Sequence, residues 1–146
     1  MKLIKNLLFT ILFFCSTTTV FSQELRDANN DLIAKIDSFG NVYDLKNLKI
    51  VEFTLEGDIL DVNNQKIGTI NGNNFKDVQG GIICYINESN QLFDSDNQMI
   101  GYVSSNLKEL FDVNDMKVLS SLTPINPKRL IAFYLFFIML WSIHFW

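Results

Sequence analysis

The segment DILDVNNQKIGTI (residues 58–70) contains one complete copy of the pattern that decides the fold. A short apolar run ends at Asp61, four residues that include two asparagines follow, and a run rich in β-branched residues ends at Ile70. Apolar and β-branched runs that alternate with clusters of Asn, Asp and Gly are typical of strands joined by turns. The segment therefore predicts a β-hairpin.

The same pattern recurs in six copies, each centred on an aspartate. The aspartates are spaced 17, 17, 16, 17 and 18 residues apart along the chain: Asp27, Asp44, Asp61, Asp77, Asp94 and Asp112. In every copy the residue two places before the aspartate is apolar, and in most copies the residue seven places after it is small. A fixed period of this kind indicates a repeat architecture, in which each unit buries its apolar face against its neighbours.

The position six residues after each aspartate is β-branched in all six copies. These residues are Ile33, Ile50, Ile67, Ile83, Ile100 and Val118. We predict equivalent, mostly buried places for them, so that replacing a central one by Ala costs about 2–5 kcal/mol of stability. Thr69 is predicted to be an exposed neighbour of Ile67, and its replacement by Ala is predicted to cost far less.

The recurring aspartates are predicted to stabilise the hairpin turns. Three residues after each of them stands Asn, Gly or Asp, which tolerate the left-handed backbone region, and an Asp that opens a turn accepts hydrogen bonds from N–H groups further along. The alternative is a cation site, because carboxylates and amide carbonyls are oxygen ligands that Ca²⁺ accepts, and a closed ring could bring several of them to one rim. Its candidate metal ligands are Asp44, Asp61, Asp94 and Asp112.

The length of the repeat limits the architecture. A single hairpin is marginally stable, whereas a ring or a stack of hairpins buries a shared core. A period of 17 residues is too short for a four-stranded propeller blade, which takes about 40 residues. We therefore predict an all-β fold: a closed ring of short two-stranded β-hairpin repeats with five or six petals, followed by a hydrophobic C-terminal tail that can be helical.

Residues 40–44 (GNVYD) and 64–70 (NQKIGTI) resemble the repeats of the β-flower proteins, which are small exported bacterial proteins, and the five-fold type is the most similar. Residues 127–137 (PKRLIAFYLFF) resemble the family's tail, a polar break followed by an Ala-aromatic run that ends in Phe. The resemblance spans residues 24 to about 137. It implies the fold and an envelope location, and it implies neither an activity nor functional residues.

The N-terminus has the three-part pattern of a secretory signal. Lys2 and Lys5 precede an apolar run, and a polar stretch then leads to Ser22, after which we expect cleavage. An uncleaved anchor and lipidation at Cys15 are the alternatives. The predicted organisation is, in chain order, signal peptide 1–22, β-flower repeat domain 23–123, linker 124–129 and hydrophobic C-terminal segment 130–146.

The C-terminal segment has two interpretations. Residues 130–146 are almost wholly apolar, and about 17 residues is the lower limit for a transmembrane helix; Trp141 and Trp146 could lie at a membrane interface. The resemblance implies instead that residues 132–137 pack against the ring as its last element. We expect the full chain to partition with membranes and a chain ending at Thr123 to stay folded.

Composition excludes several classes of function. The net charge is −4 for the whole chain and −8 over residues 24–122, which argues against a nucleic-acid partner. A single His, His144, and two Cys exclude a His-based metal site and a disulfide scaffold. Cys84 stands seven residues after Asp77, at the position of the repeat that is small in most copies, so we expect it to be buried. No cofactor is predicted, and we do not expect an enzyme.

These observations predict a non-enzymatic exported module of the cell envelope, located in the periplasm, the outer membrane or at the cell surface, with a binding or structural role. Its expected partners are a membrane, through residues 130–146, and an unknown envelope protein or glycan. The alternative function is a Ca²⁺-dependent adhesion or glycan-binding module. That alternative depends on the Asp and Asn turns and on three tyrosines predicted to be exposed: Tyr43, Tyr85 and Tyr102.

Overall fold

The computed structural model describes residues 22–139, which contain twelve β-strands followed by a helix. The strands are β1 (Gln23–Asp27), β2 (Leu32–Ile36), β3 (Asn41–Tyr43), β4 (Lys49–Phe53), β5 (Asp58–Asp61), β6 (Lys66–Asn71), β7 (Asn74–Lys76), β8 (Ile82–Ile86), β9 (Gln91–Asp94), β10 (Met99–Val103), β11 (Glu109–Asp112) and β12 (Lys117–Ser121). The helical part consists of α2 (Pro127–Phe133) and its π-helical continuation η1 (Tyr134–Met139).

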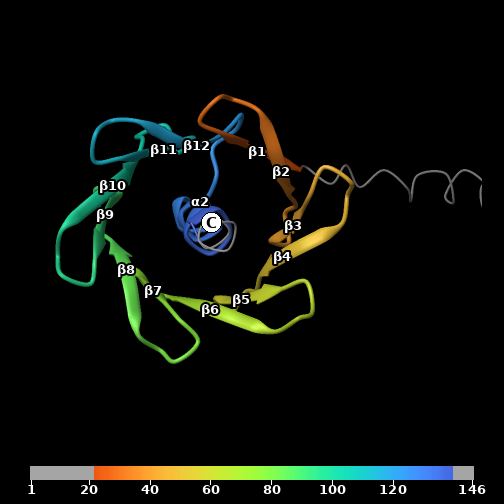
Figure 1. Cartoon of the computed structure of the whole chain (residues 1–146), viewed down its shortest axis with the longest axis horizontal. Helices are drawn as coiled ribbons and strands as arrows, with labels where there is room; N and C mark the ends of the chain where they lie inside the picture. The colour runs from red at the N-terminus through yellow and green to blue at the C-terminus, as the bar shows by residue number, and fades with distance from the viewer. Residues whose placement is uncertain (1–21, 140–146) are drawn as a thin grey trace, which may run out of the picture.

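The strands form one closed antiparallel barrel. Each strand pairs with the next one along the chain, and β1 pairs with β12 to close the ring. Figure 1 shows the hairpins arranged around the ring with their turns pointing outward like petals. Twelve strands paired in this order make six petals, from β1–β2 to β11–β12. The structure confirms the predicted all-β ring, and a closed sheet leaves no strand edge unpaired.

The returning strand of every petal contains a β-bulge, which corrects one sequence-based prediction. In the third petal the pair Ile59–Gly68 is followed by the pair Leu60–Lys66, so Ile67 has no partner across the hairpin. In every petal the residue without a partner is the one that we predicted to be mostly buried: Ile33, Ile50, Ile67, Ile83, Ile100 and Val118. These side chains are only half-buried, and that of Ile83 is exposed. The six positions are equivalent, as predicted, and five of them pack against the core, but their burial is only partial because a bulge residue is extra to the ladder and leaves the normal alternation.

Other columns of the repeat face the interior of the ring. The residue two places before each petal aspartate is buried in all six copies: Leu25, Val42, Ile59, Phe75, Leu92 and Leu110. On the returning strands the buried positions are seven and nine residues after the aspartate, as at Val51 and Phe53. Because successive side chains of a strand point to opposite faces, positions seven and nine point inward together and position six does not.

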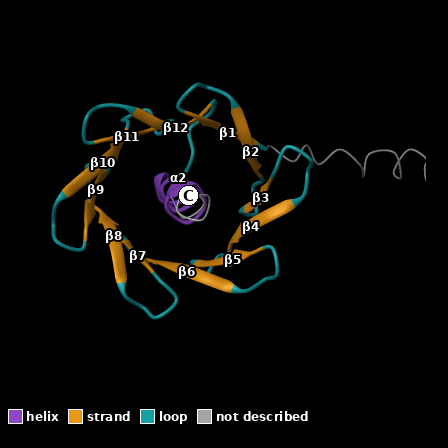
Figure 2. Cartoon of the chain, viewed as in Figure 1, coloured by secondary structure: helices purple, strands orange, loops and turns teal. Residues whose placement is uncertain are grey.

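The chain's own helix lies at the centre of the ring (Figures 1 and 2). The helix begins at Pro127, a position where the missing N–H leaves no hydrogen bond unmade. Oδ1 of Asn126 accepts a hydrogen bond from the backbone N–H of Lys128 (2.9 Å) and caps the first turn. The sequence therefore starts the helix where the chain turns from β12 into the ring.

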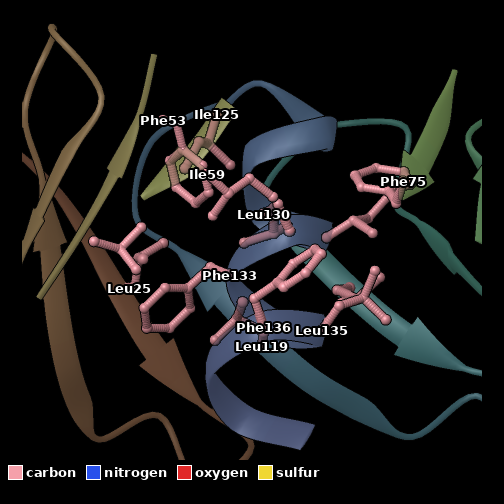
Figure 3. Close-up of a cluster of buried hydrophobic side chains, with 14 of the residues drawn as sticks. Leu25, Phe53, Ile59, Phe75, Leu119, Ile125, Leu130, Phe133, Leu135 and Phe136 are labelled. Atoms are coloured by element: carbon pink, nitrogen blue, oxygen red, sulfur yellow. The ribbon is translucent and has the colours of Figure 1, made fainter. Parts of the chain in front are cut away.

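The helix forms the centre of the core because it is apolar on almost every side. Six of its side chains are buried: Leu130, Ile131, Ala132, Phe133, Leu135 and Phe136. Figure 3 shows helix side chains packed among ring residues such as Leu25, Phe75 and Leu119. At Gly68 a Cβ atom would overlap the ring of Phe136, so this strand position has room only for glycine while Phe136 is in place.

The position of the helix changes the predicted domain organisation. The helix begins within the stretch predicted to be a linker (124–129), and residues 130–138 pack inside the ring. They include residues 132–137, which the family resemblance placed against the ring. The expectation that a chain ending at Thr123 stays folded disagrees with this arrangement, because such a chain lacks the centre of its core.

The membrane predictions concern residues at both ends of the described region. Within residues 22–139, no helix is long and apolar enough to span a membrane. Residues 1–21 of the predicted signal lie outside the described residues, as do Trp141, His144 and Trp146.

Candidate functional site: the two ends of the ring

Each petal turn is built around the carboxylate of its aspartate. In the third petal, Oδ1 of Asp61 accepts hydrogen bonds from the backbone N–H groups of Asn63 and Gln65, both at 2.8 Å. Asn64, between them, adopts a positive φ of 59°. The same pair of hydrogen bonds recurs in the other five petals, at Asp27, Asp44, Asp77, Asp94 and Asp112. The structure thus gives all six aspartates the same local role.

The four candidate metal ligands open four different petals: Asp44, Asp61, Asp94 and Asp112. Ca²⁺ takes six to eight oxygen ligands in one shell, whereas here Oδ1 of each carboxylate already accepts two backbone N–H groups. Within the part of the chain that the structure describes, no group of three or more His, Cys, Asp or Glu side chains is placed to hold a metal ion.

A second set of turns, which sequence reasoning missed, joins one petal to the next. Four of the five are opened by Asp37, Thr54, Asn87 and Ser104, whose side-chain oxygens accept hydrogen bonds from backbone N–H groups later in the same turn. These residues keep the period of the petals. Their regular spacing is visible in the sequence, but an alignment on aspartate alone does not reveal it because the opening residue differs in type at each connecting turn.

Asp37 is the buried acid of these connecting turns. Its Oδ1 accepts the backbone N–H groups of Phe39 and Asn41 (both 2.9 Å), and its Oδ2 accepts the amide of Asn41 (2.9 Å) and the hydroxyl of Tyr43 (3.2 Å). Burial alone would raise the pKa of Asp37, but these hydrogen bonds to the charged form together hold the pKa below its ordinary value. Asp37 is therefore a charged, fully bonded structural group.

The family described as 5-fold beta-flower protein matches residues 20–138, which include both the ring and the helix. The chain belongs to the β-flower family. The match confirms the resemblance that the repeats and residues 127–137 showed. This β-flower has six hairpins within residues 23–121. No curated protein and no solved structure matches the chain.

The tyrosines predicted to be exposed are half-buried in the β-flower, and two of them join neighbouring petals. Tyr85 stacks on Phe93 with ring centroids 5.3 Å apart, and its hydroxyl donates a hydrogen bond to a side chain in the next petal turn (2.9 Å). Tyr102 repeats the arrangement with Phe111 at 5.2 Å. Tyr43 is held by Asp37, as described above. All three side chains thus have structural contacts, and the sequence pattern alone did not show their partners.

Cys84 faces the interior of the ring and is fully buried, as the small-residue column predicted. Burial raises the pKa of the Cys84 thiol to about 12. The thiol is therefore protonated at neutral pH, and a protonated thiol is a poor nucleophile. Cys84 is a packing residue of the core.

One end of the β-flower has an apolar centre surrounded by the six petal turns, and we call it the petal end. Here η1 ends among the bulge residues of the ring. A groove of about 510 Å³ between the first two petals and the helix is lined by Ile33, Ile50, Phe133, Phe137 and Ile138, with Asp27 and Asp44 at its edge. A smaller hollow of about 140 Å³ lies on the other side of the helix, between Ile100, Val118 and Tyr134.

The opposite end, where the helix begins, carries the two cationic residues of the helix, and we call it the basic end. Nζ of Lys128 donates a hydrogen bond to the carbonyl of Gly72 (2.7 Å) in a connecting turn. Arg129 lines two shallow hollows between the connecting turns, one with Asp37 and one with Glu56. The two ends of the β-flower thus differ: the petal end is apolar around the helix and has acidic turns, and the basic end carries the two cations of the helix.

Proposed function

We propose that this β-flower is a non-enzymatic, exported module of the cell envelope with a structural or binding role. The observation that supports the proposal is that the recurring residues of the repeat have structural roles. The petal aspartates stabilise turns, the interior is filled by the chain's own helix, and partly exposed apolar side chains surround the helix at the petal end. A ring filled in this way presents its ends and its flank to partners.

The location of the module is also part of the proposal. The basic start, the apolar run and Ser22 support export, and the net charge of −8 over residues 24–122 suits a soluble ring. The apolar groove at the petal end and the apolar sequence of residues 140–146 support attachment to a membrane. We therefore place the module in the periplasm, at the outer membrane or at the cell surface.

Cell fractionation tests this proposal. The full chain and a variant lacking residues 1–22 are expressed in a bacterium and followed by immunoblotting with an antibody against the ring. We expect the full chain in the envelope fraction, shortened by the mass of residues 1–22, and the variant in the cytoplasm. A full chain that stays in the cytoplasm at its unprocessed mass contradicts the proposal.

A calcium titration separates the proposal from the alternative of a Ca²⁺-dependent adhesion or glycan-binding module. The proposed module shows no heat of Ca²⁺ binding and an unchanged melting temperature. Binding heat that disappears when Asp44 and Asp61 are both replaced by Asn would favour the alternative.

A further inference from the structure

The petal turns expose apolar side chains that the turns themselves do not need. The residue directly after the petal aspartate is 52–61% exposed in four petals, at Leu45, Val62, Val78 and Val113. In four connecting turns, the residue directly after the opening residue is Ser38, Leu55, Glu88 or Ser105. Turn geometry therefore accepts polar residues at this position. A large apolar residue stands there in four of the six petals and, among these four connecting turns, at Leu55 alone.

These petal tips lie on the same end of the ring as the end of the helix. Asp27 and Asp44, which open two petal turns, line one groove with Phe137 and Ile138. Asp112, which opens a third, lines the hollow on the other side of the helix with Tyr134 and Met139. The petal end consequently has an outer circle of apolar tips, an inner circle of half-buried bulge residues and the end of η1 at its centre. Exposed apolar surface arranged in this way marks an interaction site.

A flat apolar partner fits this arrangement best. Tips distributed around a closed ring can all touch a plane at once, whereas a peptide would fit only one groove. The chain also continues past Met139 for seven residues, LWSIHFW (140–146), which are rich in the aromatic and apolar types found where proteins meet a bilayer interface. Both observations point to a lipid surface.

The charge of the petal turns limits the kind of lipid. The six turns 27–31, 44–48, 61–65, 77–81, 94–98 and 112–116 contain nine carboxylates and one lysine, Lys46. Such a surface is repelled by anionic headgroups, and salt screens the repulsion. The cations of the helix, Lys128 and Arg129, lie at the other end of the ring.

We propose that the petal end docks on a lipid bilayer of low surface charge, with the petal tips entering the interface and the axis of the ring upright on the membrane. The proposal depends on the proposed function, because it names the partner of the envelope module. Its test uses purified protein and vesicles, so its result is independent of where the chain is found in cells.

Vesicle flotation tests the docking face. The purified mature chain, residues 23–146, is mixed with phosphatidylcholine vesicles, with and without one-third phosphatidylglycerol, at low and high salt. We expect binding to phosphatidylcholine that weakens with the anionic lipid and recovers with salt. Replacing Leu45, Val62 and Val113 together by Ser should weaken binding at least about tenfold, because each buried apolar group adds to membrane affinity.

The basic end supplies the matched control. Phe39 and Leu55, in connecting turns, are 73% and 92% exposed, and replacing both by Ser should leave binding unchanged. Binding that is stronger to anionic vesicles, or that depends on Phe39 and Leu55 instead of the petal tips, overturns the proposal. So does a tip variant that binds as the parent does, since residues 140–146 alone would then provide the anchor.

A second copy of the chain is the other occupant that the experiment can detect. Light scattering without lipid is measured on the parent protein and on the triple-Ser variant. A discrete dimer that the three replacements abolish, together with no binding to either kind of vesicle, would assign the petal end to self-association and overturn the proposal.

Discussion

Gly68 and Phe136 provide a quantitative test of how the helix sits in the ring. A Cβ at position 68 would overlap the Phe136 ring and lie 2.9 Å from the carbonyl oxygen of Lys76. Gly68→Ala should therefore destabilise the protein by about 1–3 kcal/mol through overpacking. Phe136→Ala should cost about 3–5 kcal/mol, because it removes a buried aromatic side chain and leaves a cavity.

The double variant measures the contact itself. With Phe136 truncated, the new methyl group at position 68 enters vacated space, and only the conflict with the Lys76 carbonyl remains. Urea unfolding followed by circular dichroism should show the double variant about 1–2 kcal/mol more stable than the sum of the single effects predicts, within the range typical of residues in contact.

Gly101 supplies the control for this cycle. A Cβ at position 101 would overlap the backbone carbonyl of Phe111, and no atom of Phe136 is among its nearest neighbours. The costs of Gly101→Ala and Phe136→Ala should add to within about 0.5 kcal/mol. Additive behaviour at Gly68 as well would refute the placement of Phe136, and with it the packing of the helix inside the ring.

Three further predictions follow from the core and the turns. Leu119→Ala, at a fully buried position, should lower stability by about 2–5 kcal/mol, and the half-buried bulge variant Val118→Ala should cost clearly less; equal shifts in melting temperature would contradict the bulge assignment. Because burial raises the pKa of Cys84 to about 12, Cys84 should resist iodoacetamide at pH 8 in the native protein and react in the unfolded protein. Peptide mass spectrometry can measure the labelling, and rapid labelling of the native protein would disprove burial. The pKa of Asp37 is lowered from 3.8 on folding, so the stability that its carboxylate contributes is complete above pH 3.8 and is lost as the pH falls through the lower folded-state pKa. Below pH 3.8 the melting temperature of Asp37→Asn should therefore fall less steeply with acidification than that of the parent. Identical slopes would count against the hydrogen-bond network around Asp37.

The repeat made the ring predictable because the petals are locally encoded. An aspartate that accepts two backbone N–H groups, followed by an asparagine or glycine in the left-handed region, is specified within five residues, as at Asp61 and Asn64. Six such turns with apolar runs between them already imply hairpins, and hairpins of this length need a shared core.

The orientation of the side chains was harder to read from the sequence. The column that includes Ile67 was assigned to the core because β-branched residues favour strands, but a bulge changes which residues face inward, and a bulge depends on pairing across the hairpin. The role of residues 130–139 was equally ambiguous, because a run of apolar residues suits a ring interior and a membrane alike. What distinguishes them is the fit between Gly68 and Phe136, which lie far apart in the sequence and meet only in the folded ring.

The most direct test of the central claim, that the chain's own helix is the core of the ring, is the thermal unfolding of two shortened chains measured by circular dichroism. One ends at Met139 and keeps the helix, and the other ends at Thr123 and lacks it. The five large buried side chains of the helix contribute about 1.5–3 kcal/mol each, which together is comparable with a typical net stability of about 5–15 kcal/mol. The account predicts a cooperative transition for the chain ending at Met139 and none for the chain ending at Thr123. A cooperative transition at the same temperature in both chains would contradict it.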